Sequence, residues 1–86
     1  MSYLLSSRDI EHWESTASRA PSVSSLLRQI SDEYGFNKYQ TASAAAEIFE
    51  ERISGEDRQV LWKWRFFESD EGFDDAEIDE LLAHLL

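Results

Sequence analysis

The fold of this chain depends on the segment QVLWKWRFF, residues 59–67, and on the acidic run that follows it. The segment holds two of the three tryptophans and two of the five phenylalanines. Residues 68–80 then carry eight carboxylates and no lysine or arginine. The rings need cover because each brings about 150–250 Å² of largely apolar surface. The carboxylates must stay in water or meet positive charge.

Residues 55–68 fit either a helix or a strand. A helix would bury one face, made of Val60, Leu61, Trp64 and Phe67. A strand would alternate its side chains between two faces, and large rings favour that state locally. The only other plausible strand is residues 3–5, however, and an isolated two-stranded ribbon is marginal in water. We therefore predict a helix, with the strand as the alternative.

Trp62 and Phe66 form a second apolar ridge on the predicted helix, because they lie four residues apart. A small core cannot enclose both faces of one helix, so this ridge needs a cover of its own. The cover is the N-terminal arm, a second subunit or a partner protein. Tryptophan is also enriched among the residues that dominate binding interfaces. Both residues are therefore candidates for partner binding.

Apolar spacing and capping residues predict four other helices. They run from the cap Ser7 to Arg19, from Pro21 or Ser22 to Tyr34, from Lys38 to Ser54, and from Asp74 to the end of the sequence. Gly35 is predicted to end the second of these in the left-handed conformation. Two segments have the spacing of capping boxes, Asn37 with Gln40 and Asp74 with Glu77.

These elements predict an all-α fold in which four to five short helices pack as an irregular bundle. Residues 1–86 would form one acidic domain, with residues 1–6 as a short arm over one end. The alternative is an α+β fold, with a small ribbon formed by residues 3–5 and 59–67.

Negative charge is concentrated in the second half of the chain. Residues 1–46 carry four basic and five acidic side chains, whereas residues 47–86 carry four basic and thirteen acidic ones. Such a field repels nucleic acids and anionic membranes and attracts basic surfaces. We therefore expect a basic protein partner, no direct nucleic acid and no membrane. The absence of cysteine, of a secretion signal and of an apolar run near ~20 residues is typical of a cytoplasmic protein.

No catalytic, metal or cofactor motif stands out. His12 and His84 are the only histidines, and helical spacing places both off the apolar stripes as solvated surface residues. An EF-hand register with Gly72 at loop position 6 would need oxygen ligands where Phe67 and Ile78 stand. The three glycines are isolated, so a phosphate-binding loop is not indicated. We therefore predict that the chain is not an enzyme and uses no cofactor or metal.

The acidic run has two interpretations. In one, it is a solvated helix N-terminus whose charge keeps an aromatic-rich protein in solution. In the other, it is a docking surface, because closely spaced carboxylates repel one another and imitate the phosphate row of a nucleic acid. The candidate partner-binding residues are Glu68, Asp70, Glu71, Asp74, Asp75, Glu77, Asp79, Glu80, Trp62 and Phe66.

The docking interpretation predicts a non-catalytic protein-binding module of the inhibitor, immunity or nucleic-acid-mimic type. It would block a basic surface of a nucleic-acid-handling enzyme or toxin, and in its simplest form it would be a monomer. The alternative is a small homodimeric regulatory or structural protein whose charge serves solubility. We further expect that neutralising Asp70, Glu71, Asp74 and Asp75 together leaves the fold intact and slows association with the partner.

Overall fold

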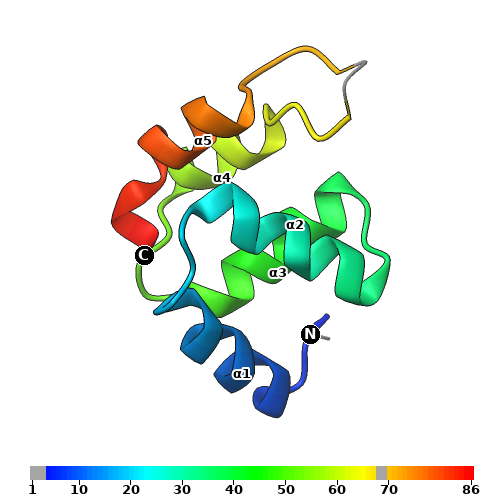
Figure 1. The fold of residues 1–86 in the computed structure, drawn as a ribbon, viewed down its shortest axis with the longest axis vertical. Helices are drawn as coiled ribbons and strands as arrows, with labels where there is room; N and C mark the ends of the chain where they lie inside the picture. The colour runs from blue at the N-terminus through cyan, green and yellow to red at the C-terminus, as the bar shows by residue number, and fades with distance from the viewer. Residues whose placement is uncertain (1–3, 68–69) are drawn as a thin grey trace.

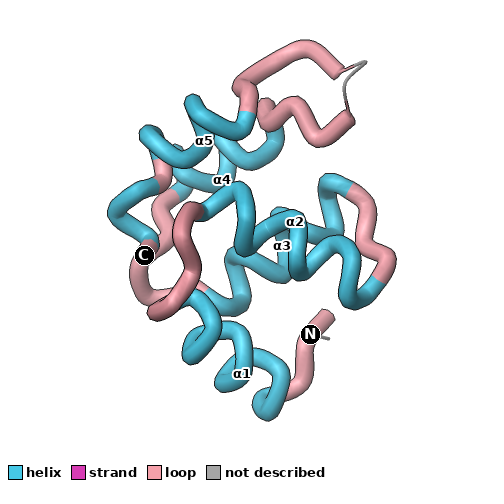
Figure 2. Tube along the Cα trace, viewed as in Figure 1, coloured by secondary structure: helices cyan, strands magenta, loops and turns pink. Residues whose placement is uncertain are grey.

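The computed structural model describes residues 4–67 and 70–86 of the chain. Its elements in order are α1 (Ser7–Ala17), α2 (Val23–Tyr34), α3 (Lys38–Ile48), α4 (Gly55–Trp62), α5 (Asp75–Leu81) and the short 3₁₀ helix η1 (Ala83–Leu85) (Figure 1). Figure 2 shows helices joined by loops, and no strand, within these described residues. The prediction of an all-α bundle of four to five short helices is confirmed, and the α+β alternative is wrong.

Side-chain caps set where the helices begin. Three helices start with complete capping boxes, formed by Asn37 with Gln40, Ser54 with Asp57 and Asp74 with Glu77. The first and third were predicted from the sequence, and the second was not. The cap of α1 is Ser6, whose Oγ accepts the Asp9 N–H at 3.2 Å, so the predicted cap Ser7 is wrong by one residue. Gly35 ends α2 in the left-handed conformation, as predicted.

α3 is shorter than predicted because the chain turns at Phe49. The N–H groups of Arg52 and Ile53 both donate to the Phe49 carbonyl, at 2.7 and 2.8 Å. This turn lets Ser54 take the extended conformation of an N-cap, which a residue inside a continuing helix could not adopt. The helix predicted over residues 38–54 therefore ends at Ile48, and the side chain of the next residue, Phe49, is buried in the core.

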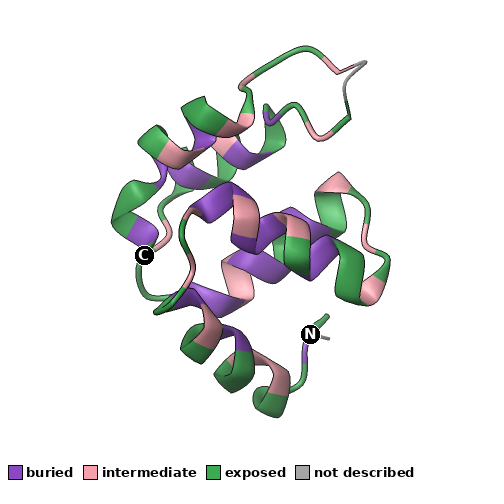
Figure 3. Cartoon of the chain, viewed as in Figure 1, coloured by how far each residue is buried: buried purple, intermediate pink, exposed green. Residues whose placement is uncertain are grey.

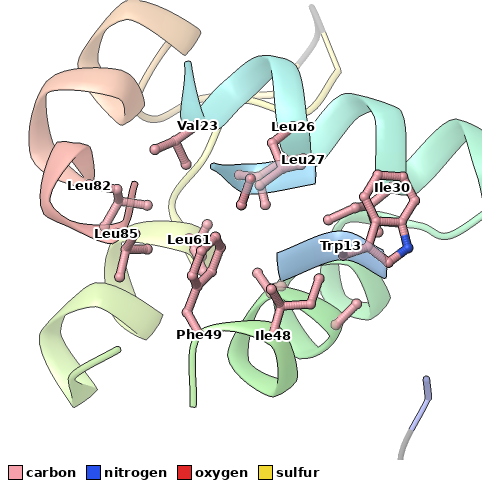
Figure 4. Packing of buried hydrophobic residues seen from close by; sticks show 14 of the residues in the cluster. Trp13, Val23, Leu26, Leu27, Ile30, Ile48, Phe49, Leu61, Leu82 and Leu85 are labelled. Atoms are coloured by element: carbon pink, nitrogen blue, oxygen red, sulfur yellow. The ribbon is translucent and has the colours of Figure 1, made fainter. Parts of the chain in front are cut away.

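α2 and α3 lie at the centre of the bundle, with α1 on one side and α4 and α5 on the other (Figure 1). Figure 3 shows that the buried positions of each helix face this centre. The largest fully buried side chains include Trp64, Leu26, Leu27, Ile30, Leu61, Ile78, Leu82 and Leu85. Figure 4 shows side chains from separate segments converging in the core, among them those of Phe49, Leu61 and Leu85. Long-range packing of short helices therefore holds the fold together.

The described part of the N-terminal arm, residues 4–6, packs on α3 and does not pair as a strand. Leu5 is buried, and the N–H groups of Leu4 and Leu5 donate to the Glu47 carboxylate at 3.0 and 3.1 Å. Residues 59–62, which the alternative fold placed in a ribbon with this arm, are helical. Residues 1–3 of the predicted arm lie outside the described residues.

A buried carboxylate joins α4 to η1. Asp57 Oδ2 lies 2.8 Å from His84 Nε2 and accepts the Ser54 N–H at 3.0 Å. Burial by itself raises the pKa of Asp57. The hydrogen bonds from His84 and Ser54 and the attraction of His84 outweigh that effect, so the pKa lies below its ordinary value of 3.8. His84 is half-exposed, but it is held by this contact and is not the simple solvated residue that was predicted.

We expect the stability difference between the native chain and Asp57→Asn to shrink as pH falls from about 5 to about 2. A carboxyl group with a lowered pKa in the folded state binds protons less readily there than in the unfolded chain. Its contribution is therefore present above the unfolded-state pKa and is lost as pH falls through the folded-state pKa. Urea unfolding followed by circular dichroism measures the difference. A stability difference that stays constant or grows as pH falls over this range would contradict the role assigned to Asp57.

Candidate functional site

The first described residues of the acidic run lie in a loop whose two ends are joined by backbone hydrogen bonds, which we call the clip. α4 ends at Trp62, and Trp64 then pairs with Phe73 as an isolated parallel bridge. The Phe73 N–H donates to the Lys63 carbonyl at 2.8 Å, and the Arg65 N–H donates to the Phe73 carbonyl at 2.7 Å. Figure 1 shows the described parts of this loop extending away from the helices, between α4 and α5. The clip therefore sets where the acidic run leaves the core.

Gly72 makes the clip possible. Its φ of +132° lies in a region that residues with a side chain rarely adopt. A Cβ atom at this position would overlap the carbonyl oxygen of Lys63, which is the oxygen that accepts the Phe73 N–H. Position 72 therefore requires glycine for two reasons, the positive φ and the close approach of the Lys63 carbonyl oxygen.

Three rings stack outward from the core at the base of this loop. Trp64 is 1% exposed, and the Phe66 ring stacks on it with the centroids 5.2 Å apart. The Phe67 ring stacks on Phe66 at 4.8 Å and is 58% exposed. The predictions that Phe67 points inward and that Phe66 forms an outer ridge with Trp62 are wrong, because the helix ends at Trp62 and helical spacing no longer applies. Trp62 itself is 59% exposed.

Arg28 of α2 holds the stack and the start of α5 together. Its guanidinium lies over the Trp64 ring, 4.8 Å from the centroid, and donates to both carboxylate oxygens of Asp75, at 3.2 and 3.0 Å. It also donates to the Phe66 carbonyl at 2.9 Å. The Trp64 Nε1–H donates to Asp75 Oδ1 at 2.8 Å. The hydrogen bond from Arg28, together with that from Trp64, holds the pKa of Asp75 below its ordinary value.

The sequence interpretation missed this role of Arg28. Asp75 lies 47 residues away in sequence, and nothing in the local pattern of α2 indicates an ion pair at that distance. Asp75 was predicted to be a free partner-binding carboxylate, whereas the structure pairs it within the chain.

Two more acidic candidates bind backbone groups of this chain. Asp70 Oδ2 accepts the Phe67 N–H at 3.0 Å and so closes a turn in the loop. Asp79 Oδ1 accepts the Ser24 N–H at 2.8 Å, at the N-terminal end of α2, where the helix dipole favours negative charge. Both carboxylates therefore have structural roles, which the sequence interpretation did not anticipate.

Four of the five remaining acidic candidates face solvent. Asp74 and Glu77 are exposed, and each uses one carboxylate oxygen in the α5 capping box. Glu71 and Glu80 are exposed and take part in no hydrogen bond or ion pair among the described residues. Glu68 lies outside the described residues. The site that the structure assembles is thus a set of exposed carboxylates beside exposed rings, a combination suited to binding cationic side chains.

These contacts indicate that neutralising Asp70, Glu71, Asp74 and Asp75 together would disturb the fold. Asp75 is paired with Arg28 and bonded to Trp64, so its loss would leave a half-buried guanidinium without its carboxylate. The charges that can be removed with least effect on the fold are those of the exposed glutamates.

Among the described residues, no group of three or more histidine or acidic side chains is arranged to hold a metal ion. None of the described helices is both long enough and apolar enough to cross a membrane. Comparison of the chain with protein-family models, with curated proteins and with solved structures gave no match.

Proposed function

We propose that the chain is a non-catalytic protein-binding module that docks on a basic surface of a partner through the acidic face of residues 70–80. The supporting observation is the shortage of internal counter-charge. Of the seven carboxylates in this described part of the run, only Asp75 lies within 4.0 Å of an arginine or lysine nitrogen. The other six repel one another, and a basic partner would relieve that repulsion and be steered toward it.

The spacing of the exposed acids supports a finer proposal. Asp74, Glu77 and Glu80 follow one another at intervals of three residues along α5. The rise of an α-helix separates consecutive members by about 4.5 Å along the helix axis, compared with the ~3.4 Å axial spacing of phosphates on one nucleic-acid strand. We therefore infer that the partner's basic surface normally receives a nucleic acid. The chain would act as an inhibitor or immunity protein by occupying that surface.

Exposed rings supply the apolar part of the contact. Trp62 and Phe67 are both more than half exposed, and aromatic residues recur among the dominant contacts of interfaces. Phe66, proposed for this role from sequence, is partly buried against Trp64. Phe67 is the better candidate because it forms the open end of the stack.

We expect the triple variant Glu71→Gln, Glu77→Gln, Glu80→Gln to associate with the partner about tenfold more slowly at low salt. Glutamine at position 77 keeps an acceptor for the α5 capping box, so the fold should be retained. The partner is first captured from cell lysate on the immobilised chain and identified by mass spectrometry. Stopped-flow or surface-based kinetics at about 50 and about 300 mM salt then measure the association rate.

The matched control removes three exposed acids from the other half of the chain, Glu11→Gln, Asp32→Asn and Glu33→Gln. It changes the net charge equally, and its association rate should stay within about twofold of the native value. Equal slowing by both variants would mean that total charge, and not this face, governs association. Displacement of the chain from its partner by duplex DNA or RNA tests the nucleic-acid-mimic proposal separately.

The second candidate, a homodimeric regulatory or structural protein, is favoured by the exposed apolar side chains. Trp62, Phe67 and Leu81 are large, apolar and exposed, and self-association would cover them. Multi-angle light scattering of the native chain and of Trp62→Ser distinguishes the candidates. A dimer that the substitution converts to a monomer would favour this second function, and a native monomer would favour the first.

A further inference from the structure

A groove of about 650 Å³ lies between α1, the C-terminal end of α3 and the segment containing η1. Its apolar lining comes from partly buried Ile10, exposed Leu86 and four buried residues, Ala17, Ile48, Phe49 and Leu85. None of its lining residues belongs to the acidic face of residues 70–80. Figure 1 shows α1 at the opposite end of the molecule from the loop that precedes α5. The groove is therefore a separate feature from the site described above.

The groove is strongly acidic where it meets solvent. Glu14, Glu47, Glu50 and Glu51 line it, and Arg52 is its one basic lining residue. The Arg52 guanidinium donates to the Leu85 carbonyl at 3.3 Å. Within the described residues, none of the four glutamates lies within 4.0 Å of an arginine or lysine nitrogen. The lining thus combines some apolar contact area with four carboxylates that form no ion pair with an arginine or lysine of the described residues.

Long-range contacts hold the walls of the groove in place. The Glu47 carboxylate accepts the N–H groups of both Leu4 and Leu5, which fixes its orientation on α3. The bond from Arg52 to the Leu85 carbonyl joins the turn after α3 to η1. The groove is therefore formed by elements that are already fixed before any ligand arrives, which lowers the entropic cost of binding.

We propose that this groove binds a basic amphipathic helix of a partner protein. Apolar side chains at i, i+3 or i+4 spacing would lie on Ile10 and Leu86, which are the apolar lining residues that reach the surface, and flanking lysines or arginines would meet the glutamates. Charge complementarity decides between the possible occupants. An anion would be repelled from this groove, and so would the acidic half of a second copy of this chain, residues 47–86. A neutral apolar compound would take water from the carboxylates without replacing it.

The test uses a defined probe and not an unknown partner. The probe is a fluorescent synthetic peptide of about 15 residues, with leucine at helical amphipathic spacing and lysine elsewhere. Two control peptides are a scrambled sequence of the same composition and a version with glutamate in place of lysine. Fluorescence anisotropy measures affinity, and amide chemical shifts measured by NMR locate the peptide. We expect the amphipathic peptide alone to bind, with shifts concentrated in α1, the end of α3 and η1.

A triple variant tests the acidic lining, namely Glu14→Gln, Glu50→Gln and Glu51→Gln. Glu47 is left unchanged because it holds the arm. We expect this variant to bind the peptide about tenfold more weakly at low salt. The matched control is Glu71→Gln, Glu77→Gln, Glu80→Gln, which removes the same charge from the other acidic face and should bind within about twofold of the native chain.

Three results would each overturn the proposal: equal binding of the scrambled peptide, unchanged affinity of the Glu14, Glu50 and Glu51 variant, or shifts located in α5. The inference does not rest on the proposed function. Slower association of the Glu71, Glu77 and Glu80 variant with the captured partner tests the acidic face, whereas peptide binding by the other variant tests the groove. Circular dichroism of both variants checks that each is folded.

Discussion

Replacing Trp64 with alanine is expected to lower the free energy of unfolding by about 3–5 kcal/mol. Trp64 is the largest fully buried side chain, and its removal leaves a cavity that short helices can only partly fill. The substitution also deletes the hydrogen bond to Asp75 and the ring beneath Arg28. A chain of this length has a total stability of roughly 4–13 kcal/mol. The loss is therefore a large share of the total.

Urea unfolding followed by circular dichroism measures this loss, with Trp62→Ala as the matched control. Trp62 is the same residue type two positions earlier, and it is exposed, so its substitution should cost less than about 0.5 kcal/mol. Trp64→Phe keeps a ring for Phe66 to stack on and removes the N–H donor. It should fall between the two alanine variants, and it stays measurable if Trp64→Ala does not fold. Equal losses at positions 62 and 64 would contradict the assignment of Trp64 to the core.

Gly72→Ala is expected to cost about 2–6 kcal/mol, although it adds only one methyl group. The strained backbone contributes about 1–3 kcal/mol. The two hydrogen bonds of the clip, between Phe73 and residues 63 and 65, contribute about 0.5–1.5 kcal/mol each if the clash with Lys63 opens it. The effect should appear both in urea unfolding and as faster amide exchange at Arg65 and Phe73.

Alanine substitutions at the other two glycines, Gly35 and Gly55, serve as controls. Gly35 has a positive φ of 67° but open space around it, so Gly35→Ala should cost about 1–2 kcal/mol through the backbone alone. Gly55 has open space and is in the first turn of α4, so Gly55→Ala should be neutral or slightly stabilising. The expected order of loss is Gly72, then Gly35, then Gly55. A Gly72→Ala variant as stable as Gly55→Ala would show that the clip does not form.

The helical fold was predictable because its signals are local. A cap and the residue three positions later specify a helix start without reference to the rest of the chain, as Asn37 and Asp74 show. Helix ends were less predictable. Apolar spacing continues past the end of α4, and only the bridge between Trp64 and Phe73 draws the chain out of the helix. That bridge depends on Gly72, whose positive φ has no signature other than glycine itself.

The candidate site was predictable in composition but not in geometry. Counting charges identified the acidic run, and the exposed position of Glu71 and Glu80 agrees with that expectation. The bonds of Asp75 with Arg28 and of Asp79 with Ser24 join residues 47 and 55 positions apart, so they depend on tertiary packing that periodicity does not describe. Partner binding by the exposed acids stays a proposal, to be tested by the variants above.

The bonds from α5 back to α2 have a consequence for how the protein is made. Asp79 supplies an acceptor for the first turn of α2, and Asp75 supplies the counter-ion for Arg28. During translation α2 is synthesised before α5, so both groups of α2 are hydrated until their partners are in place. We infer that folding of this chain is delayed until α5 has emerged, because contacts this distant in sequence form only after a costly loop closure.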